Sequence, residues 1–224
     1  VQKTPEKPFL TFQDAQFTYQ ETVETAKRYA NALSGLGIGA GDRVGLFLPN
    51  CPEFLFLLFG NAYLDSVTAP SNPEYQPSEL EHSIDLSTPE VLVTTPELLD
   101  TATEAAEGTS VERILLTEKS DSYGSLPALA AEQNSEVDAH DGDAETVGLH
   151  MYTSGTTGPP KAVECQHENW TISAIDFQKR MGFTVEDTLF TALPLFHANA
   201  QIYSTLGAAA AGAEVVIYER FSSS

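Results

Sequence analysis

Cysteine is scarce in this 224-residue chain, which contains only Cys51 and Cys165. The two lie far apart and form neither a C-x-x-C motif nor a metal-spaced pair. This pattern argues against a disulfide framework and against a structural zinc site. The sequence therefore predicts a reduced interior, in which both thiols are small buried apolar side chains rather than nucleophiles.

Long apolar runs are also missing. The most apolar stretch is Phe-Leu-Phe-Leu-Leu-Phe at 54–59, far short of the ~20 residues that span a bilayer. It predicts a buried helix and no integral membrane segment. A basic-then-apolar secretory signal and an initiating methionine are absent as well. The chain is interpreted as a piece of a cytoplasmic protein that is cut at both ends.

Basic residues are few, since 11 Lys and Arg stand against 32 Asp and Glu, for a net charge of −21. This balance disfavours nucleic acid and anionic membranes as partners, because both require cationic surfaces. The acidic residues recur along the whole chain, with a local concentration at 138–145. A dispersed acidic surface keeps a protein soluble at high salt. The hypothesis is a protein of a salt-adapted microorganism, and an ordinary acidic protein is the alternative.

Helix and strand patterns alternate along the chain. Thr18 and Glu21 have capping-box spacing, an apolar face of helical period follows, and Gly35 ends the predicted helix. The apolar run 43–48 predicts a buried strand, and Asn50 is the expected N-cap of the next helix. The same alternation predicts strands at 66–70, 90–95 and 111–117 and helices at 77–86 and 96–108.

Strands separated by helices predict an α/β fold with a mainly parallel, doubly wound sheet and helices on both faces. Residues 118–144 are polar and acidic and are expected to form a loop. Beyond them, alternating apolar residues predict a pair of strands at 145–152 and 161–167. The remaining predicted elements are a helix at 169–181 ended by Gly182, strands at 188–193 and 214–218, and a helix at 198–212.

The segment between that pair of strands has an unusual composition, Tyr-Thr-Ser-Gly-Thr-Thr-Gly-Pro-Pro-Lys-Ala-Val at 152–163. Glycine lets backbone N–H groups approach an anion closely, and hydroxyls and a lysine add donors. Charge-assisted hydrogen bonds contribute roughly 1.5–3 kcal/mol each, so the segment is a candidate phosphate cradle. Composition alone fits a polar surface hairpin equally well. The candidate ligands are Thr153, Ser154, Gly155, Thr156, Thr157, Gly158 and Lys161.

Two other phosphate-binding motifs do not fit this segment. A nucleotide-hydrolase P-loop has four residues between its glycines and Gly-Lys-Ser/Thr at a helix start. Here only two residues separate Gly155 from Gly158, and Lys161 precedes Ala162 in a predicted strand. The dinucleotide-binding G-x-G-x-x-G pattern lacks its first Gly-x. Both motifs are excluded.

Residues 152–163 closely resemble the signature loop of the adenylate-forming superfamily, whose usual form is Y-T-S-G-T-T-G-x-P-K-G. This superfamily includes acyl-CoA synthetases, luciferases and peptide-synthetase adenylation domains. The sequence departs from the pattern at Ala162, next to the lysine, where the pattern has glycine. Further matches follow in the family's order at 18–21, 41–50, 69–80, 166–169 and 193–201.

The resemblance implies an incomplete N-terminal domain of an adenylate-forming enzyme. On this basis residues 1–224 are a partial AMP-binding domain. Its expected parts are a first α/β part at 1–117, an acidic loop at 118–144, and the phosphate-loop hairpin with the start of a second α/β part at 145–224. The family's later nucleotide-binding motifs and its C-terminal domain, with the lysine that assists adenylation, are absent from these residues. The piece alone is therefore predicted to be inactive.

Members of this superfamily use ATP to convert a carboxylic acid into an acyl-adenylate, and many then transfer the acyl group to coenzyme A. Carried onto this chain, the resemblance implies that 153–158 and Lys161 hold the ATP phosphates. Thr153 would help to position Mg²⁺, and Lys161 would compensate charge on the departing pyrophosphate as a catalytic residue. The implied partners are ATP, coenzyme A and a small-molecule carboxylic acid.

His197 lies in Pro-Leu-Phe-His-Ala-Asn-Ala-Gln at 194–201. It matches the family's aromatic position beside the acyl and coenzyme A channels, so the resemblance gives it a catalytic role. The Pro-Leu-Phe-His sequence is typical of acyl-CoA ligases, and the residues that follow are similar to crotonobetaine/carnitine-CoA ligases. The favoured function is an acid–thiol ligase. The alternatives are an adenylating enzyme that does not use coenzyme A and a non-catalytic, acidic nucleotide-binding module.

Overall fold

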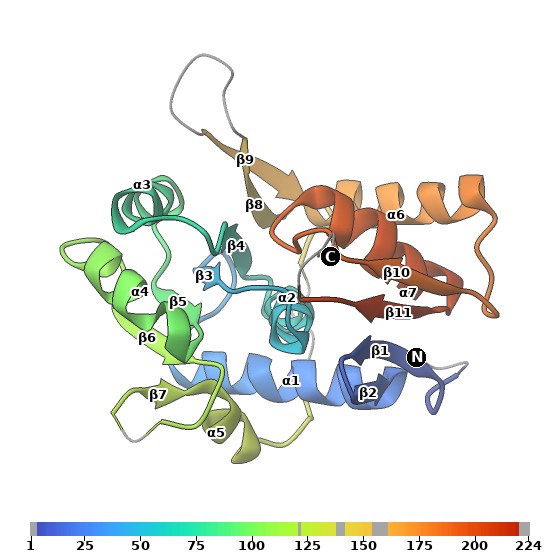
Figure 1. Cartoon of the computed structure of the whole chain (residues 1–224), viewed down its shortest axis with the longest axis horizontal. Helices are drawn as coiled ribbons and strands as arrows, with labels where there is room; N and C mark the ends of the chain where they lie inside the picture. Colours follow the sequence, from blue (N-terminus) through green and yellow to red (C-terminus); the bar gives the residue numbers. More distant parts are fainter. Residues whose placement is uncertain (1–3, 121, 138–141, 154–160, 220–224) are drawn as a thin grey trace, which may run out of the picture.

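The strands form a large and a small sheet in the computed structural model, which describes residues 4–120, 122–137, 142–153 and 161–219 (Figure 1). The large sheet contains, in spatial order, β7 (Gly124–Ser125), β6 (Arg113–Leu116), β5 (Val91–Thr94), β3 (Arg43–Phe47), β4 (Val67–Ser71), β8 (Val147–Thr153) and β9 (Lys161–Gln166). The small sheet contains β10 (Thr188–Thr191), β11 (Glu214–Ile217), β1 (Pro8–Phe12) and β2 (Ala15–Thr18). Neighbouring strands run parallel except in the pairs β8–β9 and β1–β2, which run antiparallel.

Helices occupy most of the connections between these strands. They are α1 (Tyr19–Gly35), α2 (Pro52–Leu64), α3 (Pro77–Ser87), α4 (Leu99–Ala106) after a 3₁₀ turn (Pro96–Leu98), α5 (Leu126–Ala131), α6 (His167–Met181) and α7 (Gly207–Ala211) after a π-helix (Ala200–Leu206). In the part of the chain that the structure describes, none of them has the length and apolarity needed to cross a membrane.

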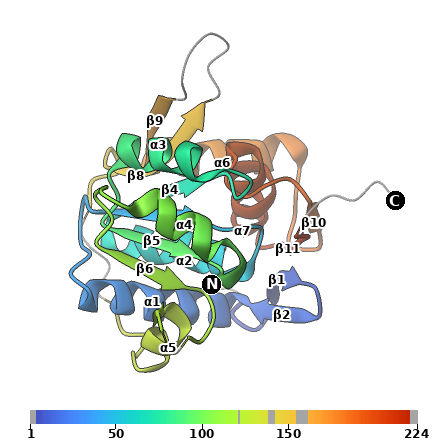
Figure 2. The same cartoon turned by 60° about the vertical axis from the view of Figure 1, so that its left-hand side comes forward.

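Apolar side chains cover both faces of the large sheet. In β3, Leu46 belongs to the apolar cluster that includes α1 and α2 residues, whereas the next residue, Phe47, belongs to the cluster with α3 and α4. Val93 and Leu92 of β5 divide in the same way, because successive side chains of a strand point to opposite faces. In Figure 2, α4 lies in front of the strands and α2 behind them. The prediction of a mainly parallel, doubly wound α/β sheet is confirmed.

The first long helix begins where its capping box predicts. The Thr18 hydroxyl accepts a hydrogen bond from Glu21 N (3.1 Å), and the Glu21 carboxylate accepts one from Thr18 N (2.8 Å). Farther along, α1 crosses α2 closely, because a Cβ added to Gly60 would lie only 2.8 Å from the carbonyl oxygen of Ala26. Glycine at position 60 therefore permits a helix crossing that a side chain would prevent.

The prediction that Asn50 caps the second helix was wrong. The helix begins at Pro52, and the Asn50 side chain bonds elsewhere. Its Nδ2 donates to the carbonyl oxygens of Leu193 and Tyr218, both at 2.9 Å, and its Oδ1 accepts from Leu195 N at 2.7 Å. Asn50 is only 5% exposed. This buried amide therefore joins the end of β3 in the large sheet to the loops that follow β10 and β11 in the small one.

Other elements also differ from the prediction. The loop expected at 118–144 contains β7 and the short helix α5, whose first turn is capped by the Ser125 hydroxyl accepting from Ala128 N. Strands β1 and β2 were not predicted, and the Thr11 hydroxyl of β1 bonds to Glu214 of β11, 203 positions away. The helix expected at 198–212 is a π-helix followed by α7. These elements are short or depend on distant partners, so local periodicity does not reveal them.

The two cysteines pack as apolar side chains. Cys51 and Cys165 are free and half-buried, and both contact the main apolar cluster. Burial raises the pKa of both thiols. Because the thiolate is the reactive form, both cysteines are poor nucleophiles near neutral pH.

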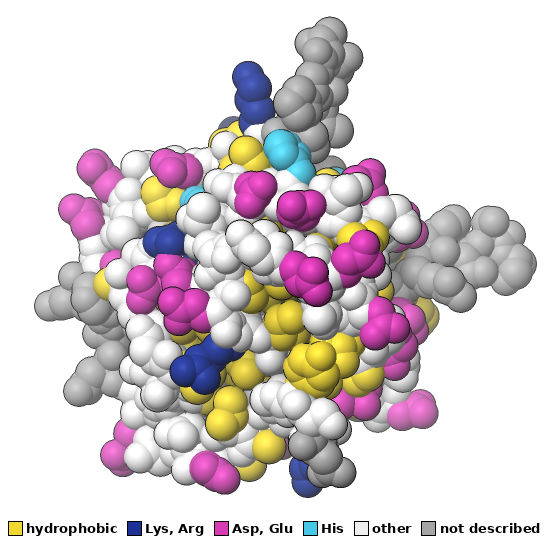
Figure 3. Space-filling model, turned by 90° about the vertical axis from the view of Figure 1, so that its left-hand side faces the viewer, with side chains coloured by type: hydrophobic (Ala, Val, Ile, Leu, Met, Phe, Trp, Pro, Cys, Tyr) yellow, Lys and Arg dark blue, Asp and Glu magenta, His cyan; other side chains and the backbone are white. Residues whose placement is uncertain are grey.

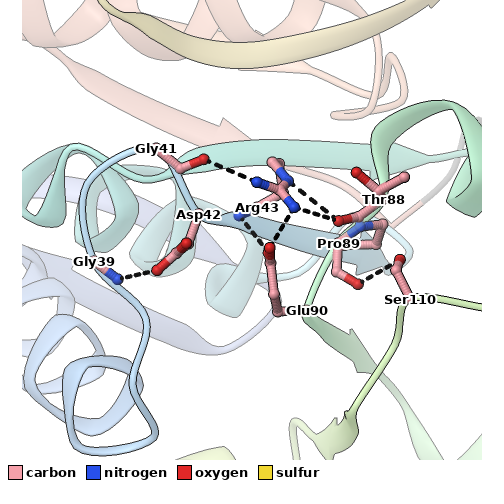
Figure 4. Close-up of polar contacts among 8 residues, drawn as sticks. All are labelled: Gly39, Gly41, Asp42, Arg43, Thr88, Pro89, Glu90 and Ser110. Carbon is pink, nitrogen blue, oxygen red and sulfur yellow. Dashed lines mark hydrogen bonds and ion pairs between the residues drawn. The ribbon is translucent and has the colours of Figure 1, made fainter.

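The amino ends of β3 and β5 carry a polar cluster (Figure 4). The Arg43 guanidinium donates to the carbonyl oxygens of Thr88 (3.1 and 3.0 Å) and Gly41 (3.3 Å), and it pairs with the Glu90 carboxylate. The same carboxylate accepts from Arg43 N at 2.7 Å. These groups satisfy one another's hydrogen-bonding capacity, so the cluster links the amino ends of β3 and β5.

Carboxylates dominate the surface. Figure 3 shows Asp and Glu side chains spread over one face of the molecule, with few Lys or Arg among them. Ion pairs on α1 and α6, such as Arg28–Glu24 (3.8 Å) and Arg180–Asp176 (2.7 Å), lie one helical turn apart. With 11 basic and 32 acidic residues, the chain has too few cations to neutralise most of its carboxylates.

Candidate active site at the carboxyl ends of the strands

A cavity of about 760 Å³, the crevice cavity, lies where the carboxyl ends of strands from both sheets meet. The chain leaves β3 toward α2 on one face of the large sheet and leaves β4 toward α3 on the other. In open α/β sheets, ligands bind outside the carboxyl ends of the strands at such a reversal. The cavity is lined by Pro49, Asn50, Asn72, Pro73, Glu74, Ala192, Leu193, Pro194, Phe196, His197 and Glu219.

A neighbouring cavity of about 430 Å³, the hairpin cavity, extends toward the end of β8. Leu193, Pro194 and His197 line both cavities, so His197 stands where the two meet. The hairpin cavity is lined by Met151, Tyr152, Thr153, Leu193, Pro194, His197, Ala198 and Asn199.

The loop that carries His197 is held by buried amides. Asn50 bonds to both Leu193 and Leu195, and Gln201, which is fully buried, donates from Nε2 to the Leu195 carbonyl oxygen at 2.6 Å. The His197 side chain itself is exposed, and its ring centroid lies 4.1 Å from that of Phe196. The result is an exposed imidazole on a firmly held loop.

Strands β8 and β9 form the predicted antiparallel hairpin, in which Thr153 lies opposite Lys161. Both side chains are exposed, and the Thr153 hydroxyl donates a long, 3.5 Å hydrogen bond to the Lys161 carbonyl oxygen. The preceding residue anchors the hairpin, because the Tyr152 hydroxyl donates to the Ser83 carbonyl oxygen of α3 (3.0 Å) and bonds to the Ser87 hydroxyl. Burial raises the pKa of Tyr152 to about 12, so its phenol stays neutral.

The structure places three of the predicted site residues. Thr153, at the end of β8 in the large sheet, and His197, in the loop after β10 of the small sheet, line the same hairpin cavity, and Lys161 lies opposite Thr153 across the hairpin. Lys161 itself does not line either cavity. The other predicted phosphate ligands, Ser154, Gly155, Thr156, Thr157 and Gly158, lie outside the described residues.

Three polar residues of the crevice cavity were not singled out from the sequence. Asn72 and Glu74 follow β4, and Glu219 follows β11. Their position directly after predicted strands could have identified them as site residues, because segments that follow the carboxyl ends of parallel strands converge at one edge of a sheet. The strands predicted at 66–70 and 214–218 end just before these residues.

An α/β sheet with a ligand crevice at its strand reversal is the architecture of nucleotide-binding enzymes. Residues 1–224 match the family described as AMP-binding enzyme, and the chain belongs to that family. It is 31% identical to medium/long-chain-fatty-acid–CoA ligase FadD6 of Mycobacterium tuberculosis, over 98% of this chain and 36% of that protein. It is also 30% identical to crotonobetaine/carnitine–CoA ligase of Salmonella paratyphi A, over 92% of this chain and 41% of that protein.

Solved structures share the fold. The anthranilate CoA ligase AuaEII in complex with anthranoyl-AMP superimposes with a TM-score of 0.91 at 23% identity, over 97% of this chain and 43% of that one. ATP-bound MatB from Rhodopseudomonas palustris has a TM-score of 0.85 at 28% identity, over the same shares. The chain thus spans about two-fifths of the length of these proteins.

Proposed function

We propose that this chain is part of an acid–thiol ligase, which activates a carboxylic acid with ATP to an acyl-adenylate and then forms the thioester with coenzyme A. The observation that carries the proposal is the hairpin cavity, which brings Thr153 and His197 together at the strand reversal. Its support is the family match and relatives whose names describe CoA ligases. The fatty acid, carnitine and aromatic acids in those names define the candidate substrates.

In this proposal the hairpin holds the ATP phosphates. Lys161 lies opposite Thr153 and provides a positive charge, whereas the charged residues that line the crevice cavity, Glu74 and Glu219, are acidic. Thr153 and residues 154–158 provide hydroxyl and backbone N–H donors. A cation is needed there because the crevice would otherwise repel a triphosphate. Lys161 then stabilises the negative charge that develops on the departing pyrophosphate.

The residues of this site fit a magnesium ion only in part. The hydroxyl of Thr153 and the carboxylates of Glu74 and Glu219 are oxygen donors, which Mg²⁺ prefers. Within the described ranges, however, no three His, Cys, Asp or Glu side chains gather to hold a metal. Thr153 would therefore hold the ion together with substrate phosphates, as is usual for Mg²⁺. When bound, the ion supplies neutralising charge to those phosphates.

His197 lies at the junction of the two cavities that form the proposed site. It lines both the hairpin cavity, where Thr153 lies, and the crevice cavity. An exposed ring on a loop fixed by Asn50 is suited to packing against an acyl group or the pantetheine arm of coenzyme A. The proposed role of His197 is therefore to position these groups and not to bind ATP.

The function is tested on the full-length protein with a panel of decanoate, crotonobetaine, 4-coumarate and anthranilate. We expect ATP- and acid-dependent AMP release that requires coenzyme A. AMP or pyrophosphate formation that is indifferent to coenzyme A would favour an adenylating enzyme with another acceptor. ATP binding without turnover on any acid would favour the non-catalytic nucleotide-binding module.

Replacing His197 with alanine should lower kcat/KM for the acid or for coenzyme A by up to about a hundredfold, because loss of positioning contacts misplaces the reacting groups. The KM for ATP should change little. Steady-state kinetics with each substrate varied in turn make the measurement, and His197→Phe, which keeps an aromatic ring, is the matched control. An effect confined to the KM for ATP would contradict the proposed role.

We also propose that the acidic surface is an adaptation to high salt. The stability of the folded protein should rise with KCl and should continue to rise above about 1 M, where the Debye length is only about 3 Å and simple screening is nearly complete. Thermal unfolding in about 0.1, 1 and 3 M KCl makes the measurement. A midpoint that is unchanged across this range, or that stops rising below 1 M, indicates an ordinary acidic protein.

A further inference from the structure

A third cavity, the helix pocket, lies between α1 and α2 and shares no residue with the crevice and hairpin cavities. Its volume of about 390 Å³ is within the range of small-molecule sites, which is about 300–1,000 Å³. Helices α1 and α2 supply most of its walls, and β1 and α7 supply the rest. The lining residues are Phe9, Tyr19, Thr22, Val23, Phe59, Ala62, Tyr63 and Ala209.

The helix pocket presents an apolar interior. Two of the hydroxyls on its walls are already bonded to the backbone, since Tyr19 donates to the Ala213 carbonyl oxygen (2.7 Å) and Thr22 to that of Thr18 (2.8 Å). The remaining walls are aromatic or aliphatic side chains, apart from the phenol of Tyr63. Such a lining favours the apolar body of a ligand and provides little for a polar one.

A cation lies beside this apolar interior. Lys27 follows Val23 by one turn of α1, and its Nζ lies 5.3 Å from the centroid of the Tyr63 ring. Among the residues that the structure describes, Lys27 forms no ion pair, while the nearby Glu24 pairs with Arg28. An ammonium has three N–H donors, so one that lies over an aromatic face still has donors left for an anion.

We propose that the helix pocket binds an amphipathic carboxylate, with its apolar tail between α1 and α2 and its head group on Lys27. Charge complementarity selects this ligand class. On a chain with a net charge of −21, an anion is repelled from most of the surface and needs a local cation to bind. This site is distinct from the proposed acid site at the strand ends and does not depend on catalysis.

The test is isothermal titration of the full-length protein with decanoate, in the absence of ATP and coenzyme A. Lys27→Gln should weaken decanoate binding about tenfold, because a charge-assisted hydrogen bond is lost, and should leave the binding of decanol unchanged. The matched control is Lys179→Gln, at an exposed lysine of α6, which should change neither affinity. Equal decanoate affinity in the Lys27→Gln variant and the unmodified protein would show that the lysine does not bind the head group and would overturn the proposal.

A second variant locates the bound tail. Ala62 is exposed at the edge of the pocket, so Ala62→Trp should fill it without disturbing the core and should abolish this binding event. Ala131→Trp, at an exposed position of α5, is the control. Methyl NMR signals of Val23 and Ala62 should shift with decanoate in the unmodified protein. Decanoate binding that survives Ala62→Trp and shifts only signals near His197 would place the ligand in the crevice and overturn the proposal, whereas the proposed ligase function would stand.

Discussion

Replacing Lys161 with alanine in the full-length enzyme should slow acid-dependent ATP–pyrophosphate exchange by roughly 10²–10³-fold, the effect of removing one preorganised donor from a charged transition state. Lys161 lies opposite Thr153 on a chain with only 11 basic residues, and the nearby crevice is lined by Glu74 and Glu219. Among the described residues that line the crevice and hairpin cavities there is no Lys or Arg, so none of them replaces the lost charge.

Measuring adenylation and thioester formation separately distinguishes a catalytic role of Lys161 from a structural one. Thioester formation from a presynthesised acyl-adenylate should be affected much less than the exchange reaction, because pyrophosphate has already departed. Lys161→Arg keeps the charge and should retain part of the exchange activity, and Lys179→Ala, at an exposed lysine on α6, should retain all of it. Equal exchange rates for Lys161→Ala and the unmodified enzyme would remove Lys161 from the mechanism.

Replacing Asn50 with alanine should destabilise the protein by about 3 kcal/mol or more, because each buried group left without a partner costs about 1–3 kcal/mol. The change removes the partner of the Leu193 and Tyr218 carbonyl oxygens and of Leu195 N. Urea unfolding measures the loss. Activity should fall as well, since the loop that carries His197 loses its attachment to β3.

A neighbouring asparagine provides the matched control. Asn72 lines the same crevice cavity, but the hydrogen bond it is seen to make is local, from Glu74 N to its Oδ1 at 3.0 Å. Asn72→Ala should therefore cost only about 1 kcal/mol. If Asn50→Ala is no more destabilising than Asn72→Ala, the amide does not join the two sheets as the structure indicates.

Local sequence patterns predicted most of the fold and, within the candidate site, the β8–β9 hairpin. The capping box of Thr18 and Glu21, the alternation of helices and strands, and the β8–β9 hairpin all lie within short stretches of sequence. The assignment of the residues after Tyr152 to a phosphate-binding loop depended on a motif of adjacent residues, and it stays a prediction, since 154–158 lie outside the described residues. In each case the interacting residues are close in sequence, where periodicity and spacing can be recognised.

Only the tertiary structure shows that Thr153 and His197 line the same cavity and that Asn50 joins the two sheets. Asn50 looked like a helix cap because Asn before an apolar run is a common cap. Its actual partners are 143, 145 and 168 positions away. The pairing of β1 with β11 likewise joins opposite ends of the chain. A hydrogen bond across such a distance leaves no periodic trace in the sequence, because its partners become neighbours only when the sheets have formed.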